Sequence, residues 1–263
     1  MGSMVNKPLQ NVYKDILHTN NSNTGLSSTT RRILTGNGDK TAFQLSDRNV
    51  KIVPAATTTT TVEIYDTSGN SLLTVDSTNQ IVKAGIGEHT VNTQYAHFGI
   101  GSGDSAWEGI SAGNHYPVPF NGYSVQVMPS FGTSADPATS YTIATEGDDF
   151  AGCFLYVMDN ISIDAVHWWS GADTATGDVT RVHLCSFDIV TGVGSTSGDL
   201  SNGTVHASAG SDITNSGYEQ TYYQDLSVSS ADVNAGKAIM FFFRNDTNNS
   251  DYSINATIKY HLR

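Results

Sequence analysis

Apolar and polar residues alternate with a period of two at the end of the chain. Ile254, Ala256, Ile258, Tyr260 and Leu262 alternate with five polar residues. Successive side chains of a strand point to opposite faces, so this pattern predicts a strand with one buried face. Because Arg263 follows this stretch directly, we expect the C-terminal end of the sequence to be tied into a sheet.

Five further strands are predicted between residues 95 and 263. They cover residues 150–158, 161–169, 179–189, 221–228 and 237–244. Long loops rich in glycine, serine and aspartate separate them, such as 191–203. Strands joined by polar loops over this length predict an antiparallel β-sandwich, jelly-roll-like, for residues 95–263.

Shorter strands with turn sequences between them are predicted between residues 41 and 90. The runs 41–46, 50–52, 62–66, 71–75 and 80–84 are rich in β-branched and aromatic residues. They contain too few large apolar side chains to offset an ordering cost of roughly 1–2 kcal/mol per residue. Residues 1–94 hold no cysteine and no cluster of metal ligands, so we expect partner chains to supply the missing core.

We therefore predict three regions. Residues 1–34 are polar and turn-rich and form an N-terminal attachment segment, residues 35–94 form a β-meander stalk, and residues 95–263 form the sandwich head. The apolar positions expected at the contact between stalk chains are Phe43, Leu45, Ile64, Leu72, Val75, Val82 and Ile86.

The composition agrees with an all-β protein and argues against several kinds of partner. Charged residues make up 14% of the chain and the formal net charge is −12. Thirteen scattered basic residues form no stripe along which a phosphate backbone could bind, so we expect no nucleic-acid partner. No run approaches the ~20 apolar residues of a membrane helix, so we expect no membrane insertion.

Residue patterns for enzyme, metal or cofactor chemistry are missing from the sequence. There is no G-x-S-x-G, P-loop or H-E-x-x-H pattern, and we expect no catalytic residues, metal or cofactor. Cys153 and Cys185 each lie in an apolar run, which favours two buried thiols over a disulfide. Asp66 and Asp173 offer oxygens for calcium, but turn initiation explains both equally well. We expect His167, within a strand, to be a core or interface residue.

Large aromatic residues are the candidates for ligand contact. Trp168 and Trp169 are adjacent, as are Tyr222 and Tyr223, so at most one residue of each pair points outward. We select Trp107, in a glycine-flanked loop, together with Trp168 and Tyr222. Filling the core is the competing role for each.

The segment 62–87 resembles the stem element of tailed-bacteriophage fibres and related trimeric adhesins. It reads as strand, Asp66-x-x-Gly69-Asn70, Leu72-x-x-Val75-Asp76, strand, then Gly85-Ile86-Gly87. Residues 36–46 are similar to another recurring stem piece. The resemblance covers residues 34–90 and implies a homotrimeric stalk. Residues 95–263 resemble the strand-rich heads of phage structural proteins in general composition, without a shared motif. The C-terminal autoproteolytic chaperone of many such fibres is not recognisable.

The resemblance implies a non-enzymatic virion protein. We expect a trimeric tail fibre or spike that attaches to other virion proteins through residues 1–34 and contacts a host-surface glycan or protein with its head. Residues 1–4 look like a cloning remnant without a following signal peptide, so we expect synthesis in the host cytoplasm. The alternatives are a capsid-attached head fibre or decoration protein without a receptor role, a glycan-degrading tail enzyme, and a cellular carbohydrate-binding module.

Overall fold

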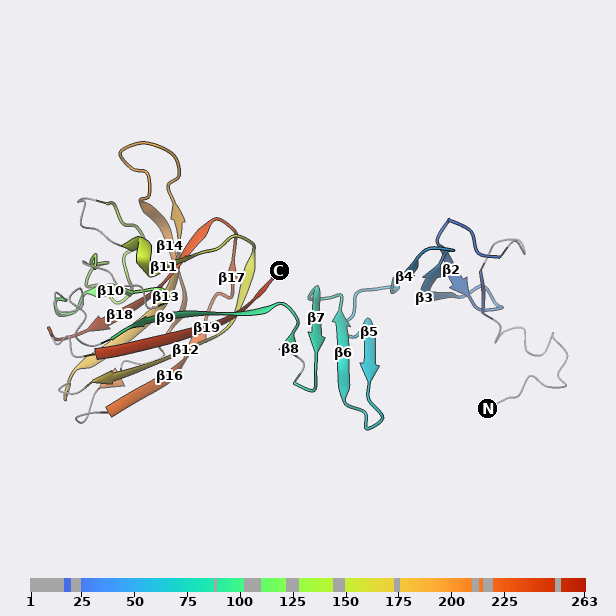
Figure 1. The fold of residues 1–263 in the computed structure, drawn as a ribbon, viewed down its shortest axis with the longest axis horizontal. Helices are drawn as coiled ribbons and strands as arrows, with labels where there is room; N and C mark the ends of the chain where they lie inside the picture. Colours follow the sequence, from blue (N-terminus) through green and yellow to red (C-terminus); the bar gives the residue numbers. More distant parts are fainter. Residues whose placement is uncertain are drawn as a thin grey trace. The chain divides into compact units, whose positions relative to one another are not determined.

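The chain folds into two compact units, Met1–Val91 and Asn92–Arg263, each built from antiparallel strands (Figure 1). The computed structural model describes residues 17–19, 25–87, 89–101, 110–121, 128–143, 150–172, 176–209, 213–214, 220–248 and 252–263. The prediction of an all-β protein is confirmed: one short 3-10 helix, Phe150–Cys153, is the sole helical element within these ranges. None of the described segments forms a helix of the length and apolarity that crossing a bilayer requires.

The first unit contains two small sheets of four strands each. One has the order β1-β2-β3-β4 and the other β5-β6-β7-β8. The strands are β1 His18–Thr19, β2 Arg31–Leu34, β3 Lys40–Leu45, β4 Val50–Ile52, β5 Val62–Tyr65, β6 Ser71–Asp76, β7 Ile81–Ala84 and β8 His89–Thr90. The five strands predicted between residues 41 and 84 are confirmed as β3 to β7, with ends that differ by a residue or so.

Two aspartates build the turns of the second sheet. A carboxylate oxygen of Asp66 accepts hydrogen bonds from the backbone N–H groups of Ser68 and Asn70, each at 2.8 Å. Asp76 accepts in the same way from Thr78 and Asn79, at 3.0 and 2.9 Å. Such carboxylate-to-backbone bonds fix a tight turn locally. The side-chain amide of the asparagine in each turn occupies the second oxygen, so turn formation accounts for both residues.

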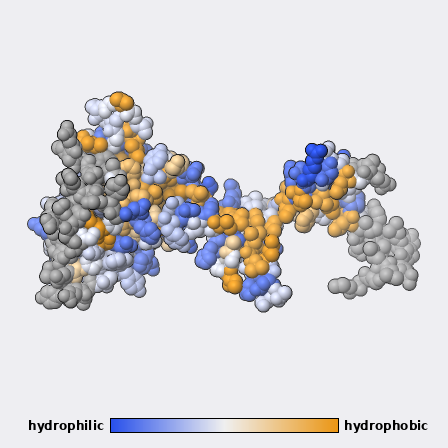
Figure 2. Space-filling view, viewed as in Figure 1, coloured by the Kyte–Doolittle hydropathy of each residue, from blue (hydrophilic) through white to orange (hydrophobic). Residues whose placement is uncertain are grey.

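Cross-strand pairing places most of the apolar residues of each small sheet on one face. Val62 pairs with Val75 and Val75 with Val82, while Ile64 pairs with Leu73. Directly paired residues of antiparallel strands share a face. Phe43–Ile52 and Leu45–Val50 are paired in the other sheet. Figure 2 shows hydrophobic side chains gathered over both sheets.

These apolar faces are open to solvent in the single chain. Phe43 is 52% exposed, Ile64 51% and Val50 66%. Up to Val91, the buried side chains among the described residues are all polar: Ser46, Thr74 and Asp76. A sheet normally buries one face against another element. The described part of the first unit therefore has strands, turns and register, but no hydrophobic core of its own.

The second unit is one 11-stranded antiparallel sheet. Its main path runs β10-β18-β13-β14-β16-β12-β19-β9. The bounds on this path are β9 Thr93–Ile100, β10 His115–Val118, β12 Ile161–Ala172, β13 Val179–Ile189, β14 Leu200–Ser208, β16 Gln220–Val228, β18 Lys237–Asn245 and β19 Tyr252–Leu262. Three short strands pair off the path: β11 Phe154–Tyr156, β15 Ile213–Thr214 and β17 Asp232–Val233.

This sheet nearly closes into a barrel rather than separating into two independent sheets. On one side β14 joins β16 through two residue pairs, Ala207–Val228 and Ser208–Ser227. On the other side Phe98 bridges to Phe120, and the N–H of Gly99 donates to the carbonyl of Pro119 at 2.8 Å. The barrel is thus made of two broad halves, β10-β18-β13-β14 and β16-β12-β19-β9, that are joined narrowly at both edges.

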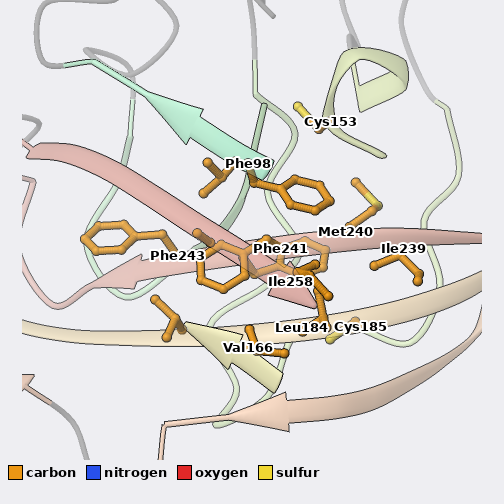
Figure 3. Close-up of a cluster of buried hydrophobic side chains, with 14 of the residues drawn as sticks. Phe98, Cys153, Val166, Leu184, Cys185, Ile239, Met240, Phe241, Phe243 and Ile258 are labelled. Carbon is orange, nitrogen blue, oxygen red and sulfur yellow. The ribbon is translucent and has the colours of Figure 1, made fainter. Parts of the chain in front are cut away.

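The main core fills the space between the two halves (Figure 3). Trp168 of β12 lies across from Phe243 of β18, with ring centroids 6.3 Å apart. Phe98 of β9 and Phe241 of β18 are also 6.3 Å apart. All four rings are fully buried. Aromatic pairs at such separations contribute beyond the area they bury, so this layer is the main stabilising element of the head.

A second buried layer lies on the other face of β13 and β18. Residues 128–143 cover this face, where Phe131 stacks on Tyr141 with centroids 4.9 Å apart and packs on Phe187 and Phe242. All six residues from Ala238 to Phe243 are consequently buried, on both faces of the strand. That double burial explains the densest apolar run of the sequence.

Two predicted elements of the head are wrong. Residues 150–158, expected to be one strand, begin with the 3-10 helix, and only Phe154–Tyr156 is a strand. The expected loop 191–203 ends early, because β14 begins at Leu200. The strands predicted within 161–169, 179–189, 221–228, 237–244 and at the C-terminal end are confirmed. Leu262 pairs with Ile161, so the end of the sequence is tied into the sheet.

Candidate functional site

The outward face of the β16-β12-β19-β9 half displays aromatic and polar side chains in register. Tyr223, Trp169 and Asn255 are neighbours across three strands, because Trp169 pairs with both of the others. Tyr223 is 72% exposed and Trp169 39%. Gly99 follows Asn255 on the next strand. This row therefore holds two exposed aromatic side chains and a half-buried amide, and we call it the aromatic row.

The neighbouring row on the same face is polar. Asp225, His167, Thr257 and His97 lie side by side across the four strands. Nδ1 of His167 lies 2.7 Å from a carboxylate oxygen of Asp225, and Nδ1 of His97 lies 3.1 Å from the hydroxyl of Thr257. The pairs fix the orientation of both imidazoles. We call this the polar row.

The two rows are also in contact with each other. The ring of His167 lies 5.5 Å from that of Tyr223, with an interplanar angle of 30°. A third row, with Ala165, Lys259 and Tyr95, continues the face, and Tyr95 is 60% exposed. Aromatic faces next to hydrogen-bonding groups can bind a ligand that has both apolar and hydroxyl-bearing surfaces.

Two of the three predicted contact residues are not the exposed members of their pairs. Trp168 is fully buried in the core, and Tyr222 is half-buried. The exposed partners are Trp169 and Tyr223. The prediction of Trp168 as a contact residue is therefore wrong, and Tyr222 is the less exposed of the two tyrosines. Trp107 lies outside the described residues.

A β-bulge decides which tryptophan points outward. Ile161 and Ile163 point inward, and the pairing of β12 with β19 then shifts by one residue at Asp164. After this bulge Val166 and Trp168 point inward. A bulge inserts one residue and so exchanges the two faces of the strand beyond it. In the sequence, Val166 is the residue that could have identified the buried tryptophan. If the apolar Val166 points inward, Trp168, two residues further on, lies on the same face.

His167 is likewise not a core residue. Its side chain is 42% exposed and bonds Asp225, whose side chain is 84% exposed. The expectation that His167 lies in the core is wrong. The alternative, that it lies at an interface, stays a prediction.

Two other histidines are buried together beneath residues 128–143. The rings of His115 and His183 meet edge to face at 5.0 Å. Nδ1 of His115 lies 3.1 Å from the carbonyl of Gly132. The remaining ring nitrogens of the pair have no hydrogen-bond partner within the part of the chain that the structure describes. Burial lowers the pKa of each imidazole to about 4, so both are neutral at pH 7.

Three charged side chains act on this pair. Arg181 on β13 and Arg244 on β18 lower the pKa of both histidines, and Asp136 on the covering segment raises it. Asp136 lies 3.7 Å from Nδ1 of His183. The two arginines oppose protonation of the histidines, and Asp136 favours it. The two buried imidazoles therefore become charged only at acidic pH.

One serine–histidine contact has the geometry of a nucleophile and its base. The hydroxyl of Ser186 lies 2.7 Å from Nε2 of His206, and Nδ1 of His206 lies 2.7 Å from the carbonyl of Ser230. Both residues are 2% exposed. A nucleophile must reach a substrate atom, and this hydroxyl points into the core. The contact joins β13 to β14 and serves packing.

The cysteine prediction is confirmed, and no metal cluster is found within the described ranges. Cys153 and Cys185 are both free and buried. Burial raises the pKa of the Cys185 thiol far above its usual value, so it stays protonated. No group of three or more His, Cys, Asp or Glu side chains in the described segments could hold a metal ion. Asp173 lies outside these segments.

Comparison with known proteins gives no relative from which a role could be transferred. No protein-family model matches the chain, and no curated protein matches it.

Proposed function

We propose that this chain is a structural protein of a virus particle: a homotrimeric bacteriophage fibre or spike whose head binds a host-surface glycan. The observation that carries the proposal is the open apolar face on both small sheets of the first unit. Three copies of the chain can bury these faces against one another, which gives the stalk the core that one copy lacks. The likeness of residues 34–90 to phage stem elements favours three copies over two.

The stalk positions chosen from the sequence fit this arrangement unequally. Ile64, Val75 and Val82 lie on the apolar face of the β5–β8 sheet, and Phe43 and Leu45 lie on that of the β1–β4 sheet. Leu72 is the unpaired residue at the register shift between the Ile64–Leu73 and Tyr65–Ser71 pairs, and is 43% exposed. Ile86, 75% exposed, lies beyond the end of β7. We assign the inter-chain core to the first five.

The strand order of the head supports the jelly-roll part of the proposal. Numbered in chain order, the eight strands of the main path pair first with eighth, second with seventh, third with sixth and fourth with fifth: β9–β19, β10–β18, β12–β16 and β13–β14. This is the pairing of one long hairpin rolled up on itself, which gives an eight-stranded jelly roll of two Greek keys.

The receptor contact is assigned to the aromatic row and the polar row. Pyranose rings have apolar faces edged by hydroxyl groups, and Trp169 and Tyr223 offer exposed rings beside Asn255 and the His167–Asp225 pair. A flat, open face of this kind binds each sugar weakly. Three heads per fibre and several fibres per particle raise the avidity without stronger single contacts.

The mass of the full chain in solution tests the stalk. We expect three times the chain mass of 28.1 kDa by light scattering. A monomer with an ordered first unit would overturn the proposal.

Glycan binding tests the head separately. On an array of bacterial surface polysaccharides, W169A and Y223A should each weaken binding at least about tenfold, in line with losing a stacked ring worth roughly 1.4 kcal/mol or more. V193A, at a fully exposed position in the loop between β13 and β14, is the control. Equal binding by all three variants would remove the receptor assignment and leave the stalk untouched.

Two alternatives are separated by further measurements. Labelling of particles in electron micrographs distinguishes a tail fibre from a capsid-attached fibre or decoration protein. Release of reducing ends from host polysaccharide would show a glycan-degrading enzyme. We favour a non-enzymatic protein because the described surface offers aromatic and amide groups, whereas the one serine–histidine contact is buried.

A further inference from the structure

An apolar pocket opens at one end of the head barrel. Its volume is about 240 Å³. Leu155 and Val157, from β11 and the residue after it, line it together with Ile161 at the start of β12 and Tyr260 near the end of β19. Met158 and Leu262 form its rim and are 81% and 36% exposed. Asp159 is the one charged residue of the described lining.

Several polar groups around this pocket have partners within the chain. The guanidinium of Arg263 donates to a carboxylate oxygen of Asp232 at 2.8 Å, and Nδ1 of His261 lies 2.8 Å from the carboxylate of Asp164. The backbone N–H of Arg263 donates to the carbonyl of Asn160. Apart from the exposed carboxylate of Asp159 and the exposed Tyr156, the pocket lining is therefore apolar. An exposed methionine beside an open apolar pocket is typical of a contact surface.

The pocket lies where the chain enters the head. Asn92, the first residue of the second unit, donates its side-chain amide to the carbonyl of Leu262 on the pocket rim, and Thr93 pairs with His261. Val91, the last residue of the first unit, directly precedes Asn92, which is bonded to Leu262. Because β8 ends two residues before Asn92, copies that associate through the β5–β8 sheet hold the points of entry into their heads close to that contact.

We propose that the pocket is a contact between heads in the assembled fibre, and that its occupant is the same apolar end of a second copy of this chain. The inference rests on the proposed trimer and names a further surface that holds it together. In a threefold assembly each copy contacts the next through two different patches. Here the two patches overlap at Met158, which lines its own pocket and is also exposed. Met158 of one copy enters the pocket of its neighbour, because its exposed, unbranched side chain adapts to an irregular apolar space.

Cysteine cross-linking on the full chain tests this contact. Both native thiols are buried, so M158C adds a single accessible thiol, and V193C adds one at a position that does not line the pocket. With a short bifunctional maleimide, M158C should give covalently linked copies and V193C should stay single. In the assembled fibre, M158C should also react with a monofunctional maleimide at least tenfold more slowly than V193C.

The outcomes separate this inference from the proposed function. A trimeric mass with cross-linked M158C supports both. A trimeric mass with M158C uncross-linked and as reactive as V193C overturns the head contact and leaves the stalk standing. A monomeric mass overturns both.

Discussion

The two units use the same secondary structure with opposite results for their apolar side chains. In the barrel, two halves of one sheet close over Phe98, Trp168 and Phe241, which are all fully buried. In the first unit, equally regular strands leave Phe43 and Ile64 about half exposed. The difference lies in what covers each sheet, because a sheet needs a second layer before its apolar face contributes stability. The barrel supplies that layer from its own strands, whereas the described residues of the first unit supply none.

The largest expected effect is on assembly through the first unit. V75D places a charge at the centre of the apolar face of the β5–β8 sheet. Each copy loses about 2 kcal/mol of apolar burial, so a trimer loses about 6 kcal/mol before the cost of burying the carboxylates. Light scattering should show monomers.

The control for V75D is K83Q, on the opposite face of the same sheet. Lys83 pairs with Thr74, whereas Val75 pairs with Val82 on the apolar face. K83Q should remain trimeric. Dissociation of both variants to the same extent would show that the apolar face does not hold the chains together.

A smaller effect is expected from truncating a side chain in the barrel core. W168A removes a fully buried ring that packs on Phe243, and should destabilise the head by about 3–5 kcal/mol. W169A, one residue along the same strand, removes a ring on the outward face and should cost less than about 1 kcal/mol. Denaturant unfolding followed by circular dichroism measures both. Similar losses for the two variants would contradict the assigned strand faces.

Per residue, the smallest expected effect is the acid sensitivity of the buried histidine pair. The described residues of the first unit contain no such pair. Folding lowers the pKa of His115 and His183 from 6.5 to about 4. Neutral imidazole is thus favoured in the folded state. The stability from this preference is complete above pH 6.5 and is lost as the pH falls toward 4. Between pH 7.5 and 4.5, we expect a loss of about 2 kcal/mol per histidine.

The melting temperature of the head between pH 7.5 and 4.5 measures this effect. H183L should flatten the profile, and H167L, at the exposed histidine, should leave it unchanged. An unchanged slope in H183L would show that the pair does not control the acid response.

The local sequence pattern predicted most strands, because the alternation and the turns that define them depend on neighbouring residues. The alternation of Ile254 to Leu262 and the Asp66 and Asp76 turns depend on neighbouring residues alone, and β3 to β7, β13 and β19 were found where the sequence places them. The start of β14 within an expected loop could not be found in this way. Its sequence, LSNGTVHAS, carries turn residues, and pairing with β13 holds it as a strand.

The sequence limited the outward aromatic residues to at most one of Trp168 and Trp169 and at most one of Tyr222 and Tyr223. The prediction selected Trp168 and Tyr222, whereas the exposed members are Trp169 and Tyr223. Which one depends on the bulge at Asp164 and on pairing with β16 and β19. The alignment of Trp169, Tyr223 and Asn255 into one row joins residues that are far apart in the chain, and no local pattern encodes it.

The all-β class, the short strands and turns of the first unit, and its small number of large apolar side chains could be predicted from the sequence. Each of these follows from residue type and from the twofold period of a strand. The folded chain was needed to see that the second unit is one nearly closed sheet and that Trp169 and Tyr223 are its exposed rings. Strand register is set by hydrogen bonds between distant segments, and a shift of one residue exchanges inside for outside.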